Sequence, residues 1–544
     1  MCYGTSYLII ELALLDLIGS CLVEVLEINA LLYLLYSAIL CYMIYRFDYI
    51  WSYLTNEPQE VMDAAKKLLT RNDYDFENKS WKESKFWYTH SNICGVETIK
   101  FPSGLCDYLS KELNLEVEHK RELQKIYKKE DVMEVARRVK AVLPSFEIRD
   151  YQIDLVLASV TKYASLIVSA TASGKTSTMT LLSLIWKRKK TLVMNNQNFI
   201  LKQIYERFIS MGIKEEEISM STDDLSKRIL IVSSQTSYNR IKQRDEDYLK
   251  FLEDVEVIIC DECAHFQSAS HFSILFFTPK LQHLVGYTAT PYKNPKNPYK
   301  NTDDMALIGL LGEPAIEFTL QNSIEGNNIA QPYSYFINYK AYPIEYPTDT
   351  PFFVQYRRSI VYNKVRNKAG IEMVKYLDKK GIKTLVLFRE VKNHGLKVML
   401  ELAKCGIKCL FLQGGEKIHE YDSALKLHSK KGNTDDIKEA LNSDYNIILA
   451  SQVMDEGVDI SLFQAGVLFT GGQSAIKIIQ QTGRVSRKKE GKENIALVVD
   501  FNDSEVNNVM NRHYKTRRKT LQNNGVIELE NVHKFFDIVD KMAQ

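Results

Sequence analysis

Cysteine and proline are scarce in this chain. Nine cysteines and 12 prolines are spread over 544 residues. At about 100–200 residues per domain, the length predicts roughly three domains. The cysteines have no regular spacing, which excludes a disulfide-stabilised mini-protein and favours a reducing, cytoplasmic setting, the host cytoplasm if the protein is viral. They are Cys2, Cys21, Cys41, Cys94, Cys106, Cys260, Cys263, Cys405 and Cys409.

Positive charge is absent from the amino-terminal stretch, because no lysine or arginine precedes Arg46. A secretory signal needs a positively charged start and a small-residue cleavage site, and the lack of both argues against secretion. The uncharged run Ile28–Tyr45 is long enough to cross a bilayer. Three interpretations stay open: a membrane anchor, a buried helical hairpin, or residues translated from a start codon upstream of the natural one. We favour the third, with Met43 as the natural start.

The net charge is also small, since 70 lysines and arginines oppose 68 acidic residues and leave +2. This balance excludes a histone-like coating protein. It leaves open an enzyme that contacts nucleic-acid phosphates with one face. Two basic clusters, residues 187–190 and 512–519, could bind phosphates or could equally be solvated faces.

From Phe146 onward, short apolar runs alternate with helical patterns, and the alternation resumes after an irregular stretch near residues 335–355. This order predicts α/β architecture: two tandem lobes, each with a parallel sheet. We divide the chain into an apolar leader (1–44), a small α+β accessory domain (45–118), a helical connector (119–145), a first lobe (146–335), a second lobe (336–510) and a basic C-terminal tail (511–544).

The strongest motif lies between an apolar run and an apolar helix. It follows the phosphate-loop pattern GxxxxGK[ST], with Ser169 in place of the first glycine. In such a loop the backbone N–H groups surround an anion, Lys175 places its charge between the β- and γ-phosphates, and the Thr176 hydroxyl ligates Mg²⁺. The predicted nucleotide-binding residues are Ser169, Ala170, Thr171, Ala172, Ser173, Gly174, Lys175 and Thr176.

Two adjacent acids, Asp261 and Glu262, follow another apolar run. We expect Asp261 to bind the nucleotide's Mg²⁺, directly or through water, and Glu262 to orient and deprotonate the attacking water. Thr176 and Asp261 are therefore the predicted metal ligands. Cys260 and Cys263 could also be half of a zinc site, but no second pair lies near them in the sequence.

The segment DECAH, which contains both acids, resembles the DEAH/DExH box of superfamily 2 helicases, and other motifs of that family follow in order. RDYQ, ending at Gln152, resembles the segment that reads the adenine edge. TATP, residues 288–291, resembles the motif that couples hydrolysis to movement. The resemblance implies two RecA-like lobes and an ATP hydrolase in which Lys175 and Glu262 are catalytic.

Two further motifs fall in the predicted second lobe. Residues 453–460 resemble motif V, and residues 480–487 match QxxGRxxR, the arginine-finger motif. An arginine finger accelerates hydrolysis by about 10³–10⁵, or ~4–7 kcal/mol. The resemblance therefore implies hydrolysis only when the lobes close over ATP. It assigns Gly457, Asp459 and Gln480 to the nucleotide and Arg484 and Arg487 to catalysis.

The amino-terminal part resembles the accessory domain of phage UvsW-type recombination helicases, through residues 47–58 and 79–113 with Trp81 and Trp87. The whole resemblance covers roughly residues 45–505. It implies an ATP-dependent DNA helicase or branch-migration translocase that acts on junctions, forks and R-loops in recombination, replication or repair. The implied cofactors are ATP and Mg²⁺, and the implied partners are branched or duplex DNA and recombination or single-strand-binding proteins. We expect a monomer that does not bind membranes.

Three alternatives stay open. The first is an RNA helicase, because DECAH does not discriminate between the two nucleic acids. The second is the motor subunit of a restriction-type system, which would need a nuclease site. The third is a membrane-tethered, nucleotide-switched scaffold that unwinds nothing, which the apolar amino terminus favours.

Overall fold

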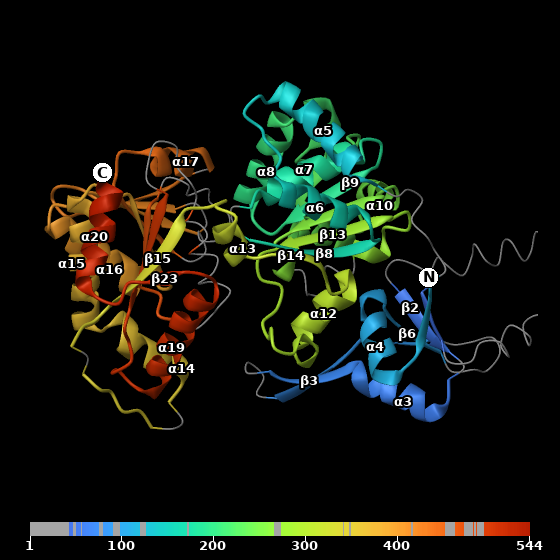
Figure 1. The fold of residues 1–544 in the computed structure, drawn as a ribbon, viewed down its shortest axis with the longest axis horizontal. Coiled ribbons are helices and arrows are strands. Elements are labelled where there is room, and N and C mark those ends of the chain that lie inside the picture. The colour runs from blue at the N-terminus through green and yellow to red at the C-terminus, as the bar shows by residue number, and fades with distance from the viewer. Residues whose placement is uncertain are drawn as a thin grey trace, which may run out of the picture. The chain divides into compact units, whose positions relative to one another are not determined.

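A computed structural model gives the architecture of the chain (Figure 1). It describes residues 43–46, 51–55, 57–75, 80–86, 88–90, 98–119, 127–170, 173–265, 274–340, 342–347, 350–414, 417–432, 434–451, 463–472, 482, 486 and 494–544. The interpretations of residues 1–42 lie outside this range and stay predictions. None of the helices in the described ranges has the length and apolar character needed to cross a membrane.

The chain divides into two compact units, Met1–Gln124 with Ile308–Leu310, and Lys125–Leu307 with Leu311–Gln544. The first unit contains a mixed five-stranded sheet in the order β5-β6-β2-β1-β7 and a separate two-stranded sheet. Its helices bury Met62, Ala65 and Leu109. The predicted α+β character is confirmed. The elements are β1 (Met43–Arg46), β2 (Trp51–Thr55), α3 (Gln59–Leu68), β3 (Thr70–Asp75), β4 (Ser80–Lys85), β5 (Tyr88–His90), β6 (Thr98–Pro102), α4 (Cys106–Leu113) and β7 (Glu116–His119).

The second unit contains two large sheets, and the first is a seven-stranded parallel sheet in the order β10-β11-β9-β12-β13-β8-β14. Several of its strands are continuous apolar runs that are buried along their whole length, as expected for parallel strands covered on both faces. The strands are β8 (Ala164–Ser169), β9 (Thr191–Asn195), β10 (Ile218–Ser219), β11 (Ile229–Ser233), β12 (Val257–Asp261), β13 (His283–Thr288) and β14 (Pro314–Phe318).

Helices of the first lobe pack on this sheet around one apolar core. They include α5, which buries Val132, Val135, Ala136 and Val139 in that core. The segment predicted as a connector therefore contributes a helix to the first lobe, because its apolar residues recur at helical spacing. The helices of this part are α5 (Lys129–Val142), α6 (Asp150–Val160), α7 (Lys175–Ile185), α8 (Asn198–Ser210), α9 (Ser234–Lys242), α10 (Glu246–Glu253), α12 (Thr302–Leu311) and α13 (Leu320–Glu325).

The second large sheet has nine strands in the order β19-β18-β17-β20-β16-β21-β22-β15-β23. Seven of them pair in parallel, and the hairpin of β18 and β19 adds two antiparallel strands at one edge. The two predicted α/β lobes with parallel sheets are thus confirmed. The strands are β15 (Gln331–Ile337), β16 (Thr384–Phe388), β17 (Cys409–Gln413), β18 (Lys417–Tyr421), β19 (Leu427–Lys431), β20 (Ile447–Ser451), β21 (Ala465–Leu468), β22 (Ile495–Phe501) and β23 (Ile527–Glu528).

Two boundaries differ from the sequence prediction. Residues 331–335 were assigned to the first lobe, but they belong to β15, which pairs with β22 of the second sheet. Residues 511–544 were predicted as a tail, but β23 pairs with β15, and Phe535, Ile538 and Val539 are buried in the core of the second lobe. The helices here are α14 (Phe352–Tyr356), α15 (Lys364–Lys379), α16 (Leu396–Lys404), α17 (Thr434–Asn442), α19 (Asn508–Asn523) and α20 (Val532–Ala543).

Candidate active site

The carboxyl ends of four parallel strands meet at one edge of the seven-stranded sheet. Strands β9, β12, β13 and β8 are consecutive neighbours there. They end at or beside Asn195, Asp261, Thr288 and Ser169, respectively. Ligands of open α/β sheets bind outside these carboxyl ends. The sheet order therefore brings together motifs that are far apart in the sequence.

The phosphate loop runs from the end of β8 to the start of α7. Ser169, which replaces the first glycine of the pattern, is buried, and its hydroxyl bonds that of Ser173 at 2.6 Å. The Ala170 N–H donates to the Phe318 carbonyl at 2.8 Å, which ties the loop to β14. Serine is accommodated because its polar atom has a partner within the loop. Thr171 and Ala172 lie outside the described residues.

Gln152 and Tyr151 hold the second half of this loop. The Gln152 Nε2 and the Tyr151 hydroxyl both donate to the Ser173 carbonyl, at 3.0 and 2.9 Å. The Gln152 Oε1 accepts from the Arg149 N–H at 3.1 Å. The ring of Tyr151 stacks on Phe318, with centroids 3.9 Å apart. The predicted adenine-reading residue therefore also supports the phosphate loop directly.

Two separate features favour glycine at position 174. Its φ is +85°, which side chains rarely adopt, and a Cβ there would lie 2.4 Å from the Gln152 Nε2. Gly312 has a similar φ of +79° but no atom within 4 Å of the equivalent Cβ. Alanine substitutions at the two positions can therefore separate the effect of backbone strain from the effect of the contact with Gln152.

We expect Gly174→Ala to weaken ATP binding, because the methyl group must displace Gln152 from the loop. Gly312→Ala should cost only the backbone strain, about 1–2 kcal/mol of unfolding free energy, and leave ATP affinity unchanged. Isothermal titration with a non-hydrolysable ATP analogue measures the affinity, and denaturant unfolding measures the stability. Equal ATP affinity in both variants would contradict the contact between Gln152 and the loop as a determinant of binding.

Lys175 and Glu262 meet across this edge. The Lys175 Nζ lies 2.9 Å from the Glu262 Oε1, and both side chains are mostly buried. Glu262 adopts a left-handed φ of 50°, a conformation that costs of order 1–3 kcal/mol and concentrates at functional sites. This left-handed residue comes directly after Asp261, the last residue of β12, so both acids lie at the carboxyl edge of the sheet. The predicted catalytic pair is therefore brought together.

Asp261 lies beside this pair and is buried. Burial raises the pKa of its carboxyl, the charge of Glu262 raises it further, and Lys175 opposes the rise. The Oδ2 accepts from the Asn195 side-chain amide at 3.1 Å, whereas the Oδ1 is buried and has no hydrogen-bond partner among the described residues. A buried acceptor of this kind is suited to a cation.

Asn195 is a member of the site that the sequence did not assign. It ends β9, one strand away from Asp261 in the parallel register. A polar residue directly after a buried apolar strand was the available indication. Tyr151 was also not assigned, although it lies in the quoted RDYQ segment.

The two cysteines around the acids are packing residues. Cys260 and Cys263 are buried, and burial raises the pKa of both thiols. The Cys263 Sγ fills the space beside Gly286 of β13, where a Cβ would lie 2.8 Å from it. Within the described ranges, no group of three or more potential metal ligands is clustered.

The TATP segment follows β13, between the strands that carry the acids and the phosphate loop. The Thr290 N–H donates to the Thr288 hydroxyl at 3.3 Å, which folds the segment back on the strand end. Both threonines are buried. The segment is therefore adjacent in the sheet to both halves of the candidate site.

The second-lobe motifs lie almost entirely outside the described residues. This applies to Gly457, Asp459, Gln480, Arg484 and Arg487, whose roles stay predictions. Of residues 480–487, only Thr482 and Ser486 are described, and the Ser486 hydroxyl donates to the Thr482 carbonyl at 2.7 Å.

Comparison with family models identifies both lobes. Residues 145–293 match the family "Type III restriction enzyme, res subunit", and residues 366–489 match the "Helicase conserved C-terminal domain". The chain belongs to the superfamily 2 helicases. This confirms the predicted family.

Relatives of this helicase include viral and fungal proteins. Candidate helicase 22 of Sulfolobus islandicus filamentous virus is 25% identical to this chain over 377 residues. These residues are 64% of this chain and 63% of that protein. ATP-dependent DNA helicase MPH1 of Debaryomyces hansenii is 37% identical over 71 residues, 13% of this chain and 6% of that one. The matches thus span less than two thirds of the length of these relatives.

The fold is shared with a solved structure, that of Dbp5. Dbp5 of S. cerevisiae, bound to RNA and ADP BeF3, has a TM-score of 0.52 at 13% identity and covers 76% of this helicase and 97% of its own chain. UvsW of phage T4 has a TM-score of 0.41 at 17% identity, over 90% of this helicase and 98% of its own chain.

Proposed function

We propose that this helicase is an ATP-driven DNA translocase that remodels branched DNA such as junctions, forks and R-loops. The observation that carries the motor activity is the meeting of Lys175, Asp261 and Glu262 at one edge of the sheet, beside the phosphate loop. The choice of branched DNA follows the resemblance of residues 45–505 to UvsW-type helicases. Recombination or single-strand-binding proteins are the partners this function implies.

In this proposal the phosphate loop and the N-terminus of α7 bind the nucleotide phosphates. Gln152 reads the adenine edge and holds the loop through Ser173. Asp261 and Thr176 would hold Mg²⁺, which neutralises phosphate charge when bound. The unpartnered Asp261 Oδ1 fits that ligand.

Glu262 is the proposed base that takes a proton from the attacking water. Its carboxylate pairs with the Lys175 ammonium, which stabilises the charged form but also competes with the water for the oxygen. Phosphate oxygens attract the same ammonium. We infer that nucleotide binding draws Lys175 from Glu262, so the base becomes fully available only when substrate is in place.

Arg484 and Arg487 are the proposed arginine fingers, supplied by the second lobe, and Gly457, Asp459 and Gln480 are the proposed nucleotide contacts beside them. Their stabilisation of about 10³–10⁵ in rate would depend on closure of the two lobes. Hydrolysis and reopening would then advance bound nucleic acid.

DNA is favoured over RNA by two observations. The sequence of the accessory domain resembles that of UvsW-type DNA helicases, and a relative that matches 71 residues of this chain carries the name of an ATP-dependent DNA helicase. The alternative of an RNA helicase is supported only by the fold it shares with Dbp5 bound to RNA.

The test compares ATP hydrolysis without nucleic acid and with duplex DNA, forked DNA, a Holliday junction or RNA. We expect the highest rate with forked DNA or the junction. Stimulation by RNA alone, or by none of these, would refute the proposal. Lack of stimulation is also what a nucleotide-switched scaffold would show.

A restriction-type motor is the second candidate, because residues 145–293 match a family described as a restriction enzyme subunit. Such a system cleaves DNA as well as moving along it. The same DNA substrates, incubated with ATP and Mg²⁺ and resolved on a gel, distinguish the two. ATP-dependent cleavage of the duplex would favour the restriction motor.

A further inference from the structure

Two basic side chains of α19 are paired with acids of the same lobe. Arg517 is buried, and it pairs with Asp500 at 2.6 Å and with Asp503 at 2.9 Å. Arg518 pairs with Glu528 at 2.7 Å. These charges are therefore compensated by acids of the same lobe.

Three other basic side chains of α19 are exposed: Arg512, Lys515 and Lys519. They are three and four residues apart, so they lie on neighbouring positions of one side of the helix. Among the described residues, none of the three forms an ion pair. Like charges at this spacing repel one another slightly. An anion bound along the helix would relieve that repulsion.

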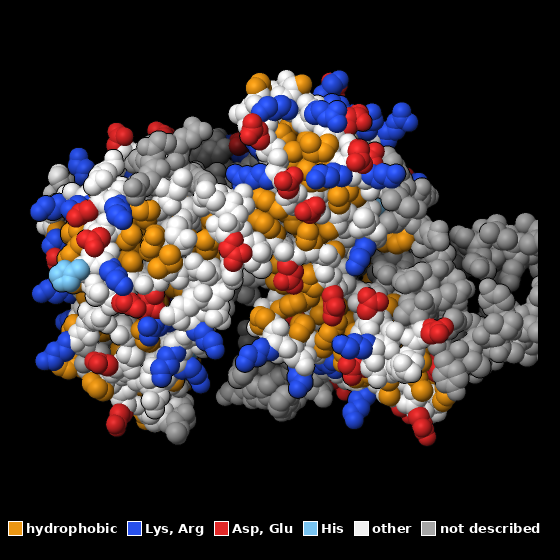
Figure 2. All heavy atoms as spheres, viewed as in Figure 1, with side chains coloured by type: hydrophobic (Ala, Val, Ile, Leu, Met, Phe, Trp, Pro, Cys, Tyr) orange, Lys and Arg blue, Asp and Glu red, His pale blue; other side chains and the backbone are white. Residues whose placement is uncertain are grey.

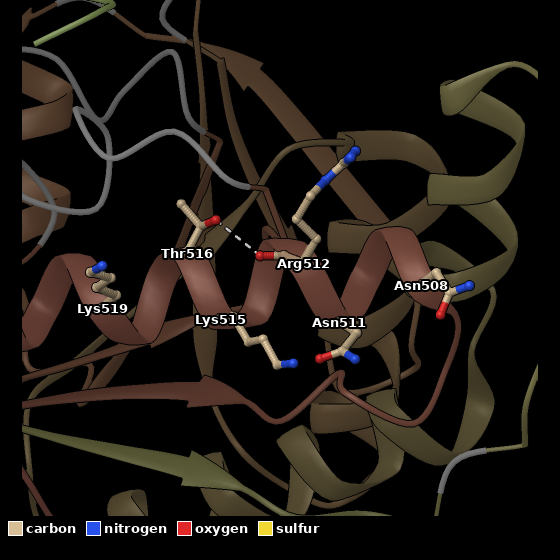
Figure 3. A pocket seen from close by; sticks show the side chains of 6 residues that line it. All are labelled: Asn508, Asn511, Arg512, Lys515, Thr516 and Lys519. Atoms are coloured by element: carbon tan, nitrogen blue, oxygen red, sulfur yellow. Dashed lines mark hydrogen bonds between the residues drawn. The ribbon is translucent and has the colours of Figure 1, made fainter. Parts of the chain in front are cut away.

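These residues border a hollow of about 420 Å³, and its described lining consists of α19 alone. The side chains of Arg512 and Lys515 extend in different directions from the helix, with asparagine amides and a threonine hydroxyl between and beside them (Figure 3). Figure 2 shows lysine and arginine side chains gathered where Figure 1 places α19. We call this surface the outer face of α19: Asn508, Asn511, Arg512, Lys515, Thr516 and Lys519.

In the other basic cluster of the sequence, residues 187–190, two of the lysines have partners within the first lobe. Lys189 pairs with Glu256 at 3.2 Å, and the Lys190 Nζ donates to the Leu225 carbonyl at 2.9 Å. The hollow beside Lys190 is lined by four aspartates as well as by Lys190, Arg240 and Lys250, so its positive charges are compensated by acids. The outer face of α19 has no acid in its described lining.

We propose that the outer face of α19 binds consecutive phosphates of a DNA backbone. The seven helical steps from Arg512 to Lys519 span about 10 Å at about 1.5 Å per residue. One DNA strand carries a phosphate about every 3.4 Å of axis, so about three phosphates lie within that span. The three cationic side chains of this face, with the asparagine and threonine donors beside them, match a row of three phosphates. This inference rests on the proposed function, because it assigns a surface to the DNA.

The test measures binding of the full chain to fluorescently labelled forked DNA at several salt concentrations. In the triple variant Arg512→Gln, Lys515→Gln and Lys519→Gln, we expect roughly tenfold or greater loss of affinity near 0.1 M salt. The slope of log affinity against log salt should become shallower by up to about 2.7, or about 0.9 per lost phosphate contact. ATP hydrolysis without DNA should not change, and the thermal midpoint should stay the same because the three side chains are exposed.

A matched control lowers the net charge by the same amount elsewhere in the second lobe. It replaces three lysines, each paired with a glutamate and with a side chain at least 36% exposed, by glutamine: Lys375, Lys404 and Lys534. Unchanged affinity and salt slope in the control, with both reduced in the α19 variant, would support the inference. Equal effects in the two variants, or none in either, would overturn it while leaving the proposed function intact. Wild-type protein that neither binds DNA nor is stimulated by it would overturn both.

Discussion

Replacing Lys175 by alanine is expected to lower the rate of ATP hydrolysis by about 10²–10³-fold and to weaken ATP binding. The Lys175 Nζ is the cation beside the phosphate loop, 2.9 Å from the Glu262 Oε1. Its removal takes away charge that stabilises the transferring phosphoryl group, and losing one such group from a water-excluded site costs about that much in rate. It also leaves Asp261 and Glu262 adjacent without their compensating cation.

Two further variants separate the roles in this cluster. Glu262→Gln should reduce turnover to a similar degree but retain ATP binding, because the ammonium of Lys175 is kept and a carboxylate near the phosphates is lost. Lys187→Ala, an exposed lysine of the same lobe, is the control and should change neither quantity. Steady-state phosphate release gives turnover, and titration with a non-hydrolysable analogue gives affinity. Retained hydrolysis in Lys175→Ala would mean that the phosphate loop does not hold the nucleotide as proposed.

Most of the strands were predictable from the sequence because parallel strands buried on both faces are continuous apolar runs. ASLIVSA, VEVIIC and IALVVDF correspond to β8, β12 and β22. The meeting of Lys175 with Glu262 followed from motif order, since both motifs end strands of one parallel sheet. Strands β14 and β15 were not predicted: in β15, buried residues alternate with half-buried ones over an aromatic stretch.

Contacts that depend on long-range pairing could not be predicted. Asn195 approaches Asp261 only because β9 and β12 are neighbours, which the sequence order of the strands does not dictate. The sequence predicts a tail for residues 511–544 because the segment begins with a helix rich in Lys and Arg. Its inward side chain, Arg517, is buried by partners that lie more than ten residues away in the sequence.

The largest loss of stability is expected from Arg517→Met. Arg517 is 2% exposed, and it belongs to a buried network with Asp500, Asp503 and Arg366. Although burial alone would raise the pKa of Asp503, the two arginines outweigh it and hold that pKa below its ordinary value. Removing one partner of a buried pair leaves an uncompensated charge, which costs about 3–5 kcal/mol. The backbone amides of β22, which carries Asp500, should then exchange hydrogen faster in native-state measurements.

A control on the same helix distinguishes this network from ordinary surface pairing. Arg518 is 46% exposed and pairs with Glu528, so Arg518→Met should cost at most about 1 kcal/mol. Adding Asp500→Asn to Arg517→Met should restore part of the lost stability, because it removes the carboxylate that the first change leaves unpaired.

Arg517 also donates to the Gly472 carbonyl at 3.1 Å, directly before the segment that leads to the arginine motif. We therefore expect ATP turnover to fall in Arg517→Met even at temperatures where the variant stays folded, while Arg518→Met keeps wild-type turnover. Equal stability and turnover in the two variants would show that the buried network does not support the second lobe.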